Sequence, residues 1–387
     1  MEVNVSGLPA HWGFLVSAGL PQLVRLIERI APTQAEVQLA ELTGAISPAV
    51  AGLLLTSPCA VDVNAPPEGT LLFAGDTAVT IEGPLWQAWI LAHVAREVLH
   101  ASCCTATRAA RLVLAARGAA VVDGSSCLLA SSDHAVETAR SAFVGGVLHT
   151  QSPVAAARLG VSLRASAPAE AIALAGPPPS HSARMSGWDF AHTVSDVLVP
   201  LGPGDDEEET LSDLQRSAVQ SDGWVSRSLA ARHTELRMRC DLVALEQGGV
   251  WVPRLGAVAD ISCVPGRKLV IRYADPTGRP IADIVHGVGE RIQPAAQAFV
   301  IGYQQTGVGV PLQGAESALP LLTSVVRSGR RVGPDEGIQS VRERVHHALQ
   351  QLADPYKRLR HPSVFPVGMA PALAQLKSDL LAQACGI

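Results

Sequence analysis

The sequence predicts an α/β fold with a barrel-like middle part flanked by β-rich ends. Apolar residues recur at helical spacing between Gly83-Pro84 and Gly118, which predicts one long buried helix. Between residues 115 and 200, short apolar strands alternate with helices, the pattern of parallel βα units. Residues 238–285 are rich in β-forming residues, and Gly and Asp turn signals divide them into hairpins. These three observations together favour an α/β barrel.

The N-terminal part, residues 1–114, is predicted to be an α+β unit that ends in the long helix. Residues 11–30 pass from an apolar, strand-like run through a Gly-Leu-Pro turn into a helix. Two amphipathic helices are expected over residues 33–55. Antiparallel strands are expected over residues 61–82, where apolar and polar residues alternate.

Residues 115–240 are predicted to form a truncated, barrel-like α/β domain. The Pro/Gly/Ser-rich stretch 172–187 interrupts the alternation of strands and helices and is expected to be a loop. The acidic run Asp205–Glu209 begins a helix. We expect a solvated first turn there, because the helix dipole favours acidic residues at that end, with a magnesium site as the alternative.

Residues 241–387 are predicted to complete a second domain with hairpins and C-terminal helices. A Gly-Gly turn and the turn at 275–278 each join two strands, and the hairpin over 268–283 has the stronger pattern. Helices are expected over residues 335–352 and 370–383.

Composition argues against several classes of partner. A net charge of −5 and a pI near 6.2 do not favour nucleic acid, which needs concentrated Lys and Arg. No apolar run reaches about 18 residues, and the start of the chain, MEVNVSGLPAHWG, lacks a basic segment followed by an apolar one. We therefore expect a soluble, cytoplasmic protein without membrane contact. The seven cysteines form no CxxC pair or zinc-type cluster, so we expect reduced, mostly buried thiols and no metal centre.

Several stretches resemble segments of the nicotinate phosphoribosyltransferase family in their order and spacing. The N-terminal ones are an early strand and helix, HWGFLVSAGLPQLVRLIE, an EGT strand, APPEGTLLF, and a long helix with an AAR ending, IEGPLWQAWILAHVAREVLHASCCTATRAARL. The later ones are a GG signature segment, ARSAFVGGVLHTQSPVAAARLGV, and a PGRK hairpin, VPGRKLVIRYADPTGRPIADIV. The tail over residues 321–381 is similar to the family throughout. The resemblance therefore covers much of the chain.

The resemblance implies an irregular α/β barrel that carries the phosphoribosyl site, together with an α/β sandwich built from both chain ends. It also implies the family's reaction in NAD salvage and pyridine nucleotide biosynthesis. In that reaction nicotinate is joined to phosphoribosyl pyrophosphate, with ATP hydrolysis through a phosphohistidine. Phosphoribosyl pyrophosphate and ATP with magnesium are implied only where this activity is retained. Family members pair head to tail, so a homodimer or a heterodimer with a homologous chain is expected, with the active site at the subunit interface.

The residues that carry the family's chemistry are replaced in this sequence. The family's paired arginines fall near residues 127–129, but no Arg occurs between residues 118 and 139. Counting without gaps from Gly145-Gly146 places the family's catalytic histidine within residues 165–169, which read Ala-Ser-Ala-Pro-Ala, with alanine at the acceptor position. A methyl group cannot accept a phosphoryl group, so this count excludes coupling to ATP by the family route.

The barrel is also predicted to be incomplete. The segment between Pro200 and Cys240 is too short for the several βα units that carry the family's LD(S/T) and SGG phosphate-binding loops. Ala92 stands where the family has a glutamate in the long helix. The scaffold is thus retained mainly outside the region of the transfer chemistry.

Two residues are the candidates for catalysis, His149 and Arg164. Arg164 lies beside the replaced histidine run at a predicted strand end, where barrel active sites gather, and is a candidate anion contact. His149 is the titratable group nearest to the family's TSN position. The candidate ligand contacts lie at that position and after it: Thr150, Gln151, Ser152, Arg164 and Ser166.

Other basic residues are interpreted first as structural. His93 and His100 could share one face of the long helix, as satisfied histidines or as a relocated acid/base pair. Arg108 and Arg111 suit the C-terminal end of the helix dipole, with a phosphate contact as the alternative. The Arg-Lys pair at 267–268 is expected to be structural rather than a phosphate site.

The leading hypothesis is a diverged nicotinate phosphoribosyltransferase-like pseudoenzyme, which acts as a non-catalytic subunit of a homologous partner. A redirected enzyme on a pyridine or ribosyl-phosphate substrate is the first alternative. A working nicotinate phosphoribosyltransferase is the second. A small-molecule ligand remains possible under each of them.

Overall fold

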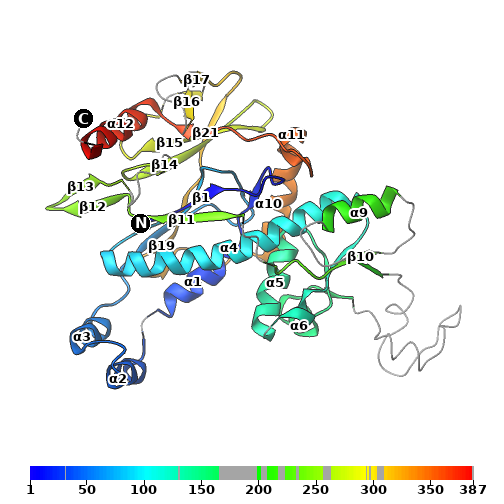
Figure 1. Cartoon of the computed structure of the whole chain (residues 1–387), viewed down its shortest axis with the longest axis horizontal. Coiled ribbons are helices and arrows are strands. Elements are labelled where there is room, and N and C mark those ends of the chain that lie inside the picture. The colour runs from blue at the N-terminus through cyan, green and yellow to red at the C-terminus, as the bar shows by residue number, and fades with distance from the viewer. Residues whose placement is uncertain are drawn as a thin grey trace, which may run out of the picture.

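The computed structural model describes residues 1–30, 32–129, 131–164, 198–201, 207–216, 223–231, 235–255, 263–292, 294–295, 298–302 and 309–385. A single long helix, α4 (Leu85–Ala116), runs through the middle of the molecule along its long axis (Figure 1). Two antiparallel-rich sheets lie towards its first half, and a parallel sheet lies towards its second half. The other elements are arranged around this helix.

The predicted long helix is confirmed, and its ends follow the sequence signals. Pro84 precedes its first residue, which suits the first turn of a helix. Arg117 and Gly118 follow its last turn with positive φ angles of 47° and 97°, a left-handed conformation that ends a helix. Small buried side chains such as Ala106, Ala109 and Ala110 let neighbouring elements approach closely.

The first six-stranded sheet contains strands from both ends of the chain. Its order is β11-β1-β5-β3-β19-β20, and all its neighbouring strands are antiparallel. The strands are β1 (Glu2–Gly7), β3 (Asp62–Ala65), β5 (Thr77–Glu82), β11 (Arg237–Asp241), β19 (Thr323–Arg327) and β20 (Arg330–Arg331). One face of the sheet packs its valines and Ile81 against Leu91, Ala95 and Leu99 of α4. A short pair, β2 (Leu15–Val16) and β4 (Leu71–Leu72), accompanies it.

The second six-stranded sheet is built from the C-terminal third, in the order β17-β16-β21-β15-β14-β18. Its centre is the predicted hairpin of β14 (Lys268–Ala274) and β15 (Pro280–Gly287). Asp275 Oδ1 accepts hydrogen bonds from the backbone N–H groups of Thr277 and Arg279 in the turn. The remaining strands are β16 (Phe299–Gly302), β17 (Val310–Pro311), β18 (Ser317–Pro320) and β21 (Val367–Met369). The Gly-Gly hairpin, β12 (Ala244–Gln247) with β13 (Val250–Pro253), is confirmed as well.

The middle of the chain contributes a five-stranded parallel sheet in the order β8-β7-β6-β10-β9. Its strands are β6 (Val121–Asp123), β7 (His149–Thr150), β8 (Ser162–Leu163), β9 (Leu198–Pro200) and β10 (Gly223–Ser226). Two helices connect three of them: α5 (Ser132–Val144) and α6 (Pro153–Leu159). A short 3₁₀ turn, η1 (Ser125–Leu128), follows β6. The predicted α/β class, with an incomplete barrel and strands from both chain ends in one sheet, is confirmed.

The other helices agree with the sequence patterns to within a few residues, except for the short α11, which was not predicted. They are α1 (Leu20–Glu28), α2 (Gln34–Leu42), α3 (Pro48–Thr56), α9 (Glu207–Arg216), α10 (Ile338–Gln351), α11 (Asp354–Lys357) and α12 (Pro371–Cys385). The expected loop over 172–187 lies outside the described residues. The domain boundaries at 114 and 240 stay predictions. In the part of the chain that the structure describes, no helix is long and apolar enough to cross a membrane.

The acidic run at the start of α9 differs from its prediction. Glu207 and Glu208 are only 5% and 6% exposed, so the expectation of a solvated turn is wrong for both. Both oxygens of Glu208 accept hydrogen bonds from Arg111 of α4, from Nε and Nη2, each at 2.8 Å. The neighbouring Glu209 is partly exposed and accepts two hydrogen bonds from Arg360. Because α9 packs on α4, its first turn faces protein instead of water.

We predict that Glu208→Ala destabilises the protein far more than Glu209→Ala. Removing Glu208 leaves Arg111, which is 1% exposed, as a buried charge without its carboxylate, a loss of about 3–5 kcal/mol in free energy of unfolding. The pair of Glu209 and Arg360 is solvated, so its loss should be close to neutral. Urea denaturation of the two variants measures the difference, and similar midpoints would contradict the assignment.

Candidate functional site

The carboxyl ends of β6, β7 and β10 bring together a cluster of buried polar residues. Asp123 ends β6 and is 1% exposed. Its Oδ1 accepts hydrogen bonds from the backbone N–H of Ser125 at 3.0 Å and from the Ser125 hydroxyl, and its Oδ2 accepts one from Thr150 Oγ1 at 3.0 Å. Burial raises the pKa of Asp123 above its ordinary value, while these hydrogen bonds act in the opposite direction.

A second carboxyl group lies at the end of the adjacent strand. Ser226 of β10 pairs with Asp123 in the parallel register. The Ser226 hydroxyl donates to Glu207 Oε2 at 2.5 Å, and the Arg227 N–H donates to Glu207 Oε1 at 3.3 Å. Two buried carboxyl groups therefore occupy the ends of neighbouring strands, and they accept hydrogen bonds from local donors.

The residues predicted at the TSN position take part in the same network. Thr150 Oγ1 also accepts a hydrogen bond from the Ser152 N–H at 3.1 Å, and the Gln151 N–H donates to the Asp123 carbonyl at 2.8 Å. Ser152 caps α6 by accepting from the Ala155 N–H at 3.2 Å. Thr150 and Ser152 are 2% and 5% exposed. The structure thus gives both side chains structural partners, and their role as ligand contacts stays a prediction.

Of the two catalytic candidates, His149 lies on β7 and Arg164 directly follows β8. His149 and Thr150 are consecutive residues of β7, so their side chains point to opposite faces of the sheet. Arg164 follows β8, is partly buried, and its N–H donates to the Thr150 carbonyl at 3.0 Å. The structure therefore places Arg164 at the same edge of the sheet as Thr150. Ser166 and the run 165–169 lie outside the described residues.

Arg108 and Arg111, near the end of α4, both donate hydrogen bonds to other parts of the chain. Arg108 Nη1 donates to the Ser228 carbonyl at 2.6 Å, and Arg111 Nη2 donates to the Leu359 carbonyl at 3.1 Å in addition to binding Glu208. These contacts favour the structural interpretation of both side chains over a phosphate contact. Arg108 thereby also holds the segment that follows β10, next to the strand-end cluster.

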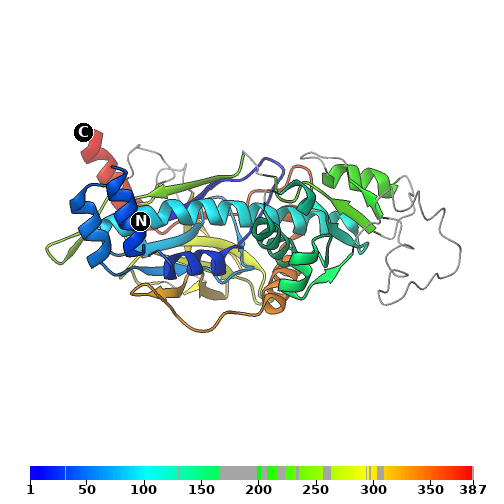
Figure 2. The ribbon, with the colours of Figure 1, turned by 90° about the horizontal axis from the view of Figure 1, so that it is seen from below.

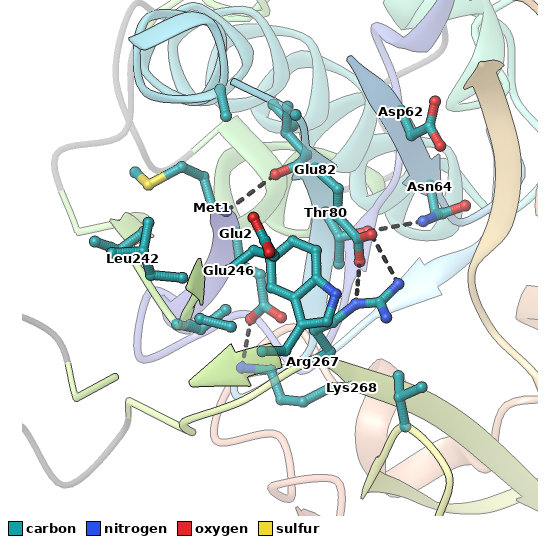
Figure 3. A pocket seen from close by; sticks show the side chains of 18 of the residues that line it. Met1, Glu2, Asp62, Asn64, Thr80, Glu82, Leu242, Glu246, Arg267 and Lys268 are labelled. Carbon is teal, nitrogen blue, oxygen red and sulfur yellow. Dashed lines mark hydrogen bonds and ion pairs between the residues drawn. The ribbon is translucent and has the colours of Figure 1, made fainter. Parts of the chain in front are cut away.

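A separate cleft of about 890 Å³ lies at the other half of α4 (Figure 3). Arg267 binds Glu82 through Nε and Nη2 at 3.0 and 2.8 Å, and its guanidinium lies 4.8 Å from the ring centre of Trp251. Lys268 Nζ lies 2.5 Å from Glu2 Oε2, and both side chains are buried. The structural interpretation of residues 267–268 fits these pairs. None of the predicted site residues lines the cleft.

Asp123 was not among the predicted site residues, and Glu207 was named only as part of the acidic run Asp205–Glu209. The string VVDG contained a signal for the first, because an acidic residue that follows a short buried strand lies at the edge of a parallel sheet where active sites gather. No local sequence pattern indicates that Glu207 accepts a hydrogen bond from Ser226. Among the residues that the structure describes, no three His, Cys, Asp or Glu side chains form a group that could hold a metal ion.

The family model and the related sequences that match this chain are all nicotinate phosphoribosyltransferases. Residues 267–377 match the family model described as the nicotinate phosphoribosyltransferase C-terminal domain. The chain is 29% identical over 164 residues to nicotinate phosphoribosyltransferase pncB2 of Mycobacterium tuberculosis, which covers 41% of this chain and 35% of that protein. It is 22% identical over 201 residues to mouse nicotinate phosphoribosyltransferase, covering 52% of this chain and 37% of the relative. The aligned segments thus span little more than a third of these relatives.

Two solved structures share the fold over most of the chain. Human nicotinic acid phosphoribosyltransferase superposes with a TM-score of 0.75 at 19% identity, covering 98% of this chain and 95% of that one. Nicotinate-nucleotide pyrophosphorylase from Pyrococcus furiosus superposes with a TM-score of 0.59 at 16% identity, covering 90% of this chain and 88% of that one. At these identities the likeness concerns the fold.

We predict that Thr150→Val lowers the free energy of unfolding by about 1–3 kcal/mol, because it leaves a buried acceptor on Asp123 and the Ser152 N–H without their hydroxyl partner. Thr150→Ser keeps the hydroxyl and loses one methyl group, so it should cost less, about 1 kcal/mol. Thermal and urea unfolding of both variants checks this order. An equal loss in the two would mean that the methyl group, not the network, stabilises the site.

Proposed function

This chain belongs to the nicotinate phosphoribosyltransferase family, and we propose that it has lost ATP-coupled phosphoribosyl transfer to nicotinate and acts as a non-catalytic subunit of a homologous partner. The observation that carries the proposal is the closed network at the strand ends. Hydroxyl and N–H donors of Ser125, Thr150, Ser226 and Arg227 bind the carboxyl groups of Asp123 and Glu207.

That network is poorly suited to phosphoribosyl pyrophosphate. A pyrophosphate needs several donors and fixed guanidinium groups close to it. Here the local donors already bind carboxyl groups, and an ionised carboxylate repels an approaching polyphosphate. Near this edge, Arg108 already donates to the Ser228 carbonyl, Arg164 lies beyond the outer strand β8, and Arg227 is exposed. This charge pattern supports the loss of pyrophosphate binding.

The replaced residues of the sequence support the same conclusion. Residues 118–139 contain no arginine, and the alignment from Gly145-Gly146 places alanine at the family's phosphoryl acceptor. Because a methyl group cannot form the phosphoenzyme, ATP hydrolysis cannot be coupled to transfer by the family route.

The partner role is supported by what has been kept. The family match covers residues 267–377, which include the β14–β15 hairpin, α10 and the first part of α12. Residues such as Tyr273, Ile284 and Val341 are buried in this part, so its core is well packed. A scaffold that persists without the transfer chemistry fits a subunit of a pyridine nucleotide or NAD salvage enzyme whose partner performs the reaction.

One observation favours a second candidate, a redirected enzyme. Arg164 lies at the end of β8, next to the Thr150 carbonyl, where a single anionic group of a pyridine or ribosyl-phosphate substrate would find a guanidinium. In that function Arg164, Thr150, Gln151 and Ser152 would be ligand contacts and His149 a titratable neighbour. A working nicotinate phosphoribosyltransferase is the remaining alternative.

We predict that the purified chain forms no nicotinate mononucleotide from nicotinate, phosphoribosyl pyrophosphate and magnesium ATP. The expected rate is at least about a thousandfold below an ordinary enzyme rate of about 1 per second, and labelled ATP should leave no phosphorylated chain. The Mycobacterium tuberculosis relative, assayed in parallel, serves as the control. Turnover near 1 per second, or a phosphoenzyme, would show that the chemistry is intact.

We also predict that the tagged chain, expressed in its own cells, co-purifies with a homologous chain that carries the family's arginines and histidine. The complex should withstand gel filtration at physiological salt, because subunit interfaces of obligate assemblies are large and apolar. Mass spectrometry of the eluted complex identifies the companion. Recovery of this chain without any homologue would refute the partner role and leave the loss of catalysis untouched.

A further inference from the structure

The two six-stranded sheets share one hydrophobic core. Figure 1 shows β14 and β15 next to β1 and β11, and Figure 2 shows the yellow strands of the second sheet behind α4. Val270 of β14 and Val285 of β15 belong to the same buried cluster as Val3 and Val5 of β1. A polar side chain at the junction of the two sheets is therefore removed from water.

Two aspartates and one arginine are buried at this junction. Asp76 lies in the turn between β4 and β5, Asp283 lies on β15, and both are 0% exposed. Arg272 of β14 donates to both oxygens of Asp283, from Nε at 2.8 Å and from Nη2 at 2.5 Å. The same Nη2 donates to the Leu71 carbonyl at 2.8 Å and lies 3.9 Å from Asp76 Oδ2. One guanidinium group thus faces two carboxyl groups.

The turn that carries Asp76 is fixed to the first sheet. The Val5 N–H of β1 donates to the Asp76 carbonyl at 2.8 Å, and Asp76 Oδ2 accepts a hydrogen bond from the Phe73 N–H at 2.8 Å. The Phe73 ring stacks on Phe365 with ring centres 3.7 Å apart, and the Arg272 guanidinium lies 5.3 Å from the Phe73 ring centre. Asp76 therefore belongs to the first sheet by its backbone and meets the second sheet through its side chain.

The three side chains lack one hydrogen-bond donor when both aspartates are ionised. Among the described residues, Asp76 Oδ1 is a buried oxygen that accepts no hydrogen bond. Ionised carboxylates only accept hydrogen bonds, so two of them cannot bind each other. One guanidinium group also leaves a net negative charge in this buried site, where like charges repel strongly.

The surroundings of Asp76 favour its neutral form. Burial, the charge of Asp283 and a hydrogen bond with Asp283 raise the pKa of Asp76 well above its ordinary value. The charge of Arg272 and the Phe73 N–H act in the opposite direction. In the described chain, the charged groups that face Asp76 are thus Arg272 on β14 and Asp283 on β15.

We propose that Asp76 and Asp283 share one proton, and that this proton holds the two six-stranded sheets together. With one proton, the two carboxyl groups and the guanidinium group are neutral in total, and the protonated oxygen donates a hydrogen bond to the other carboxyl group. Because Asp76 is fixed to β1 and Asp283 lies on β15, loss of the proton creates repulsion between the sheets. The three residues form a pH-sensitive contact, which we call the aspartate clamp.

The aspartate clamp does not depend on the proposed function. Its three residues lie outside the strand-end cluster, and none of them lines the cleft. Detection of enzyme activity would leave the clamp unaffected. In the same way, failure of the clamp would leave the proposed loss of catalysis intact.

The stability that the clamp contributes should fall as pH rises. An aspartate in the unfolded chain ionises near pH 4. Because the folded pKa of Asp76 is higher, the folded chain retains a proton that the unfolded chain has released. The folding equilibrium constant should therefore fall by up to about tenfold per pH unit above about pH 4, until the folded pair ionises. Below that window the contribution is complete.

The test is urea denaturation of the full-length chain and of Asp76→Asn from pH 5 to pH 9. Asparagine has nearly the shape of aspartate, and its amide donates a hydrogen bond to Asp283 at every pH. We expect the ratio of the two folding constants to shift at least about tenfold in favour of the variant over this range. Asp133→Asn is the matched control, because the Asp133 side chain is 80% exposed. Its stability should run parallel to that of the wild type.

The ratio isolates the clamp from other buried acids. Burial also raises the pKa values of Glu2 and Asp123, but both residues are unchanged in these chains, so their contributions cancel. In Asp283→Asn, a single carboxylate remains for Arg272, so the same shift relative to the wild type is expected. This second variant measures the shared proton independently of Asp76→Asn.

Infrared spectroscopy and hydrogen exchange locate the proton and its effect. At pH 7 the wild type should show the carbonyl band of a neutral carboxylic acid, and this band should weaken in Asp76→Asn. At pH 9 the amides of β5 and β14 should exchange faster in the wild type than in Asp76→Asn. Parallel stability curves for the wild type and both asparagine variants would overturn the proposal. So would a carboxylic acid band that Asp76→Asn leaves unchanged.

Discussion

The packing of α4 is the constraint on which the rest of the structure depends. This helix has small buried side chains where other elements cross it, and those side chains also satisfy backbone groups. The Thr107 hydroxyl accepts a hydrogen bond from the Val16 N–H at 2.8 Å, and Cys103 Sγ accepts one from the Ala18 N–H at 3.3 Å. A Cβ atom on Gly145 would lie 2.2 Å from the Ala106 carbonyl oxygen, so only glycine permits this approach of α5. Contacts with α4 thus position elements on both sides of it, the N-terminal β2 segment and α5.

Buried charges connect distant segments of this scaffold. Arg111 binds Glu208, Arg140 binds Glu68 through two hydrogen bonds of 2.8 and 2.6 Å, and Lys268 pairs with Glu2. Each pair joins residues more than 70 positions apart in the chain. Such pairs contribute little net stability, but removal of one partner is costly, so they specify which segments meet. In the first two pairs, the guanidinium groups of Arg111 and Arg140 therefore bind carboxylates of the chain itself.

The sequence predicted the elements whose signals are local. The long helix, the hairpin at 275–278 and the two short helices after Thr33 follow from apolar spacing, turn residues and caps, which act over a few positions. The partners of Glu207 and Glu208 lie 19 and 97 residues away, and no local pattern encodes such contacts. The strand-end residues Thr150 and Ser152 were placed by family resemblance. Their burial required the strand register that pairs Asp123 with Thr150 and Ser226.

Charge balance links the fold to the proposed function. An active site for a pyrophosphate needs cationic groups that the protein leaves without carboxylate partners until substrate arrives. Here, Glu208 binds Arg111, and the donors at the ends of β6, β7 and β10 bind Asp123 and Glu207. In the proposed function, a phosphate site at these strand ends would need both additional arginines and removal of these carboxyl groups, each of which accepts hydrogen bonds within the local fold. Under the proposed function, several coupled substitutions at these strand ends would therefore separate this chain from ATP-coupled transfer.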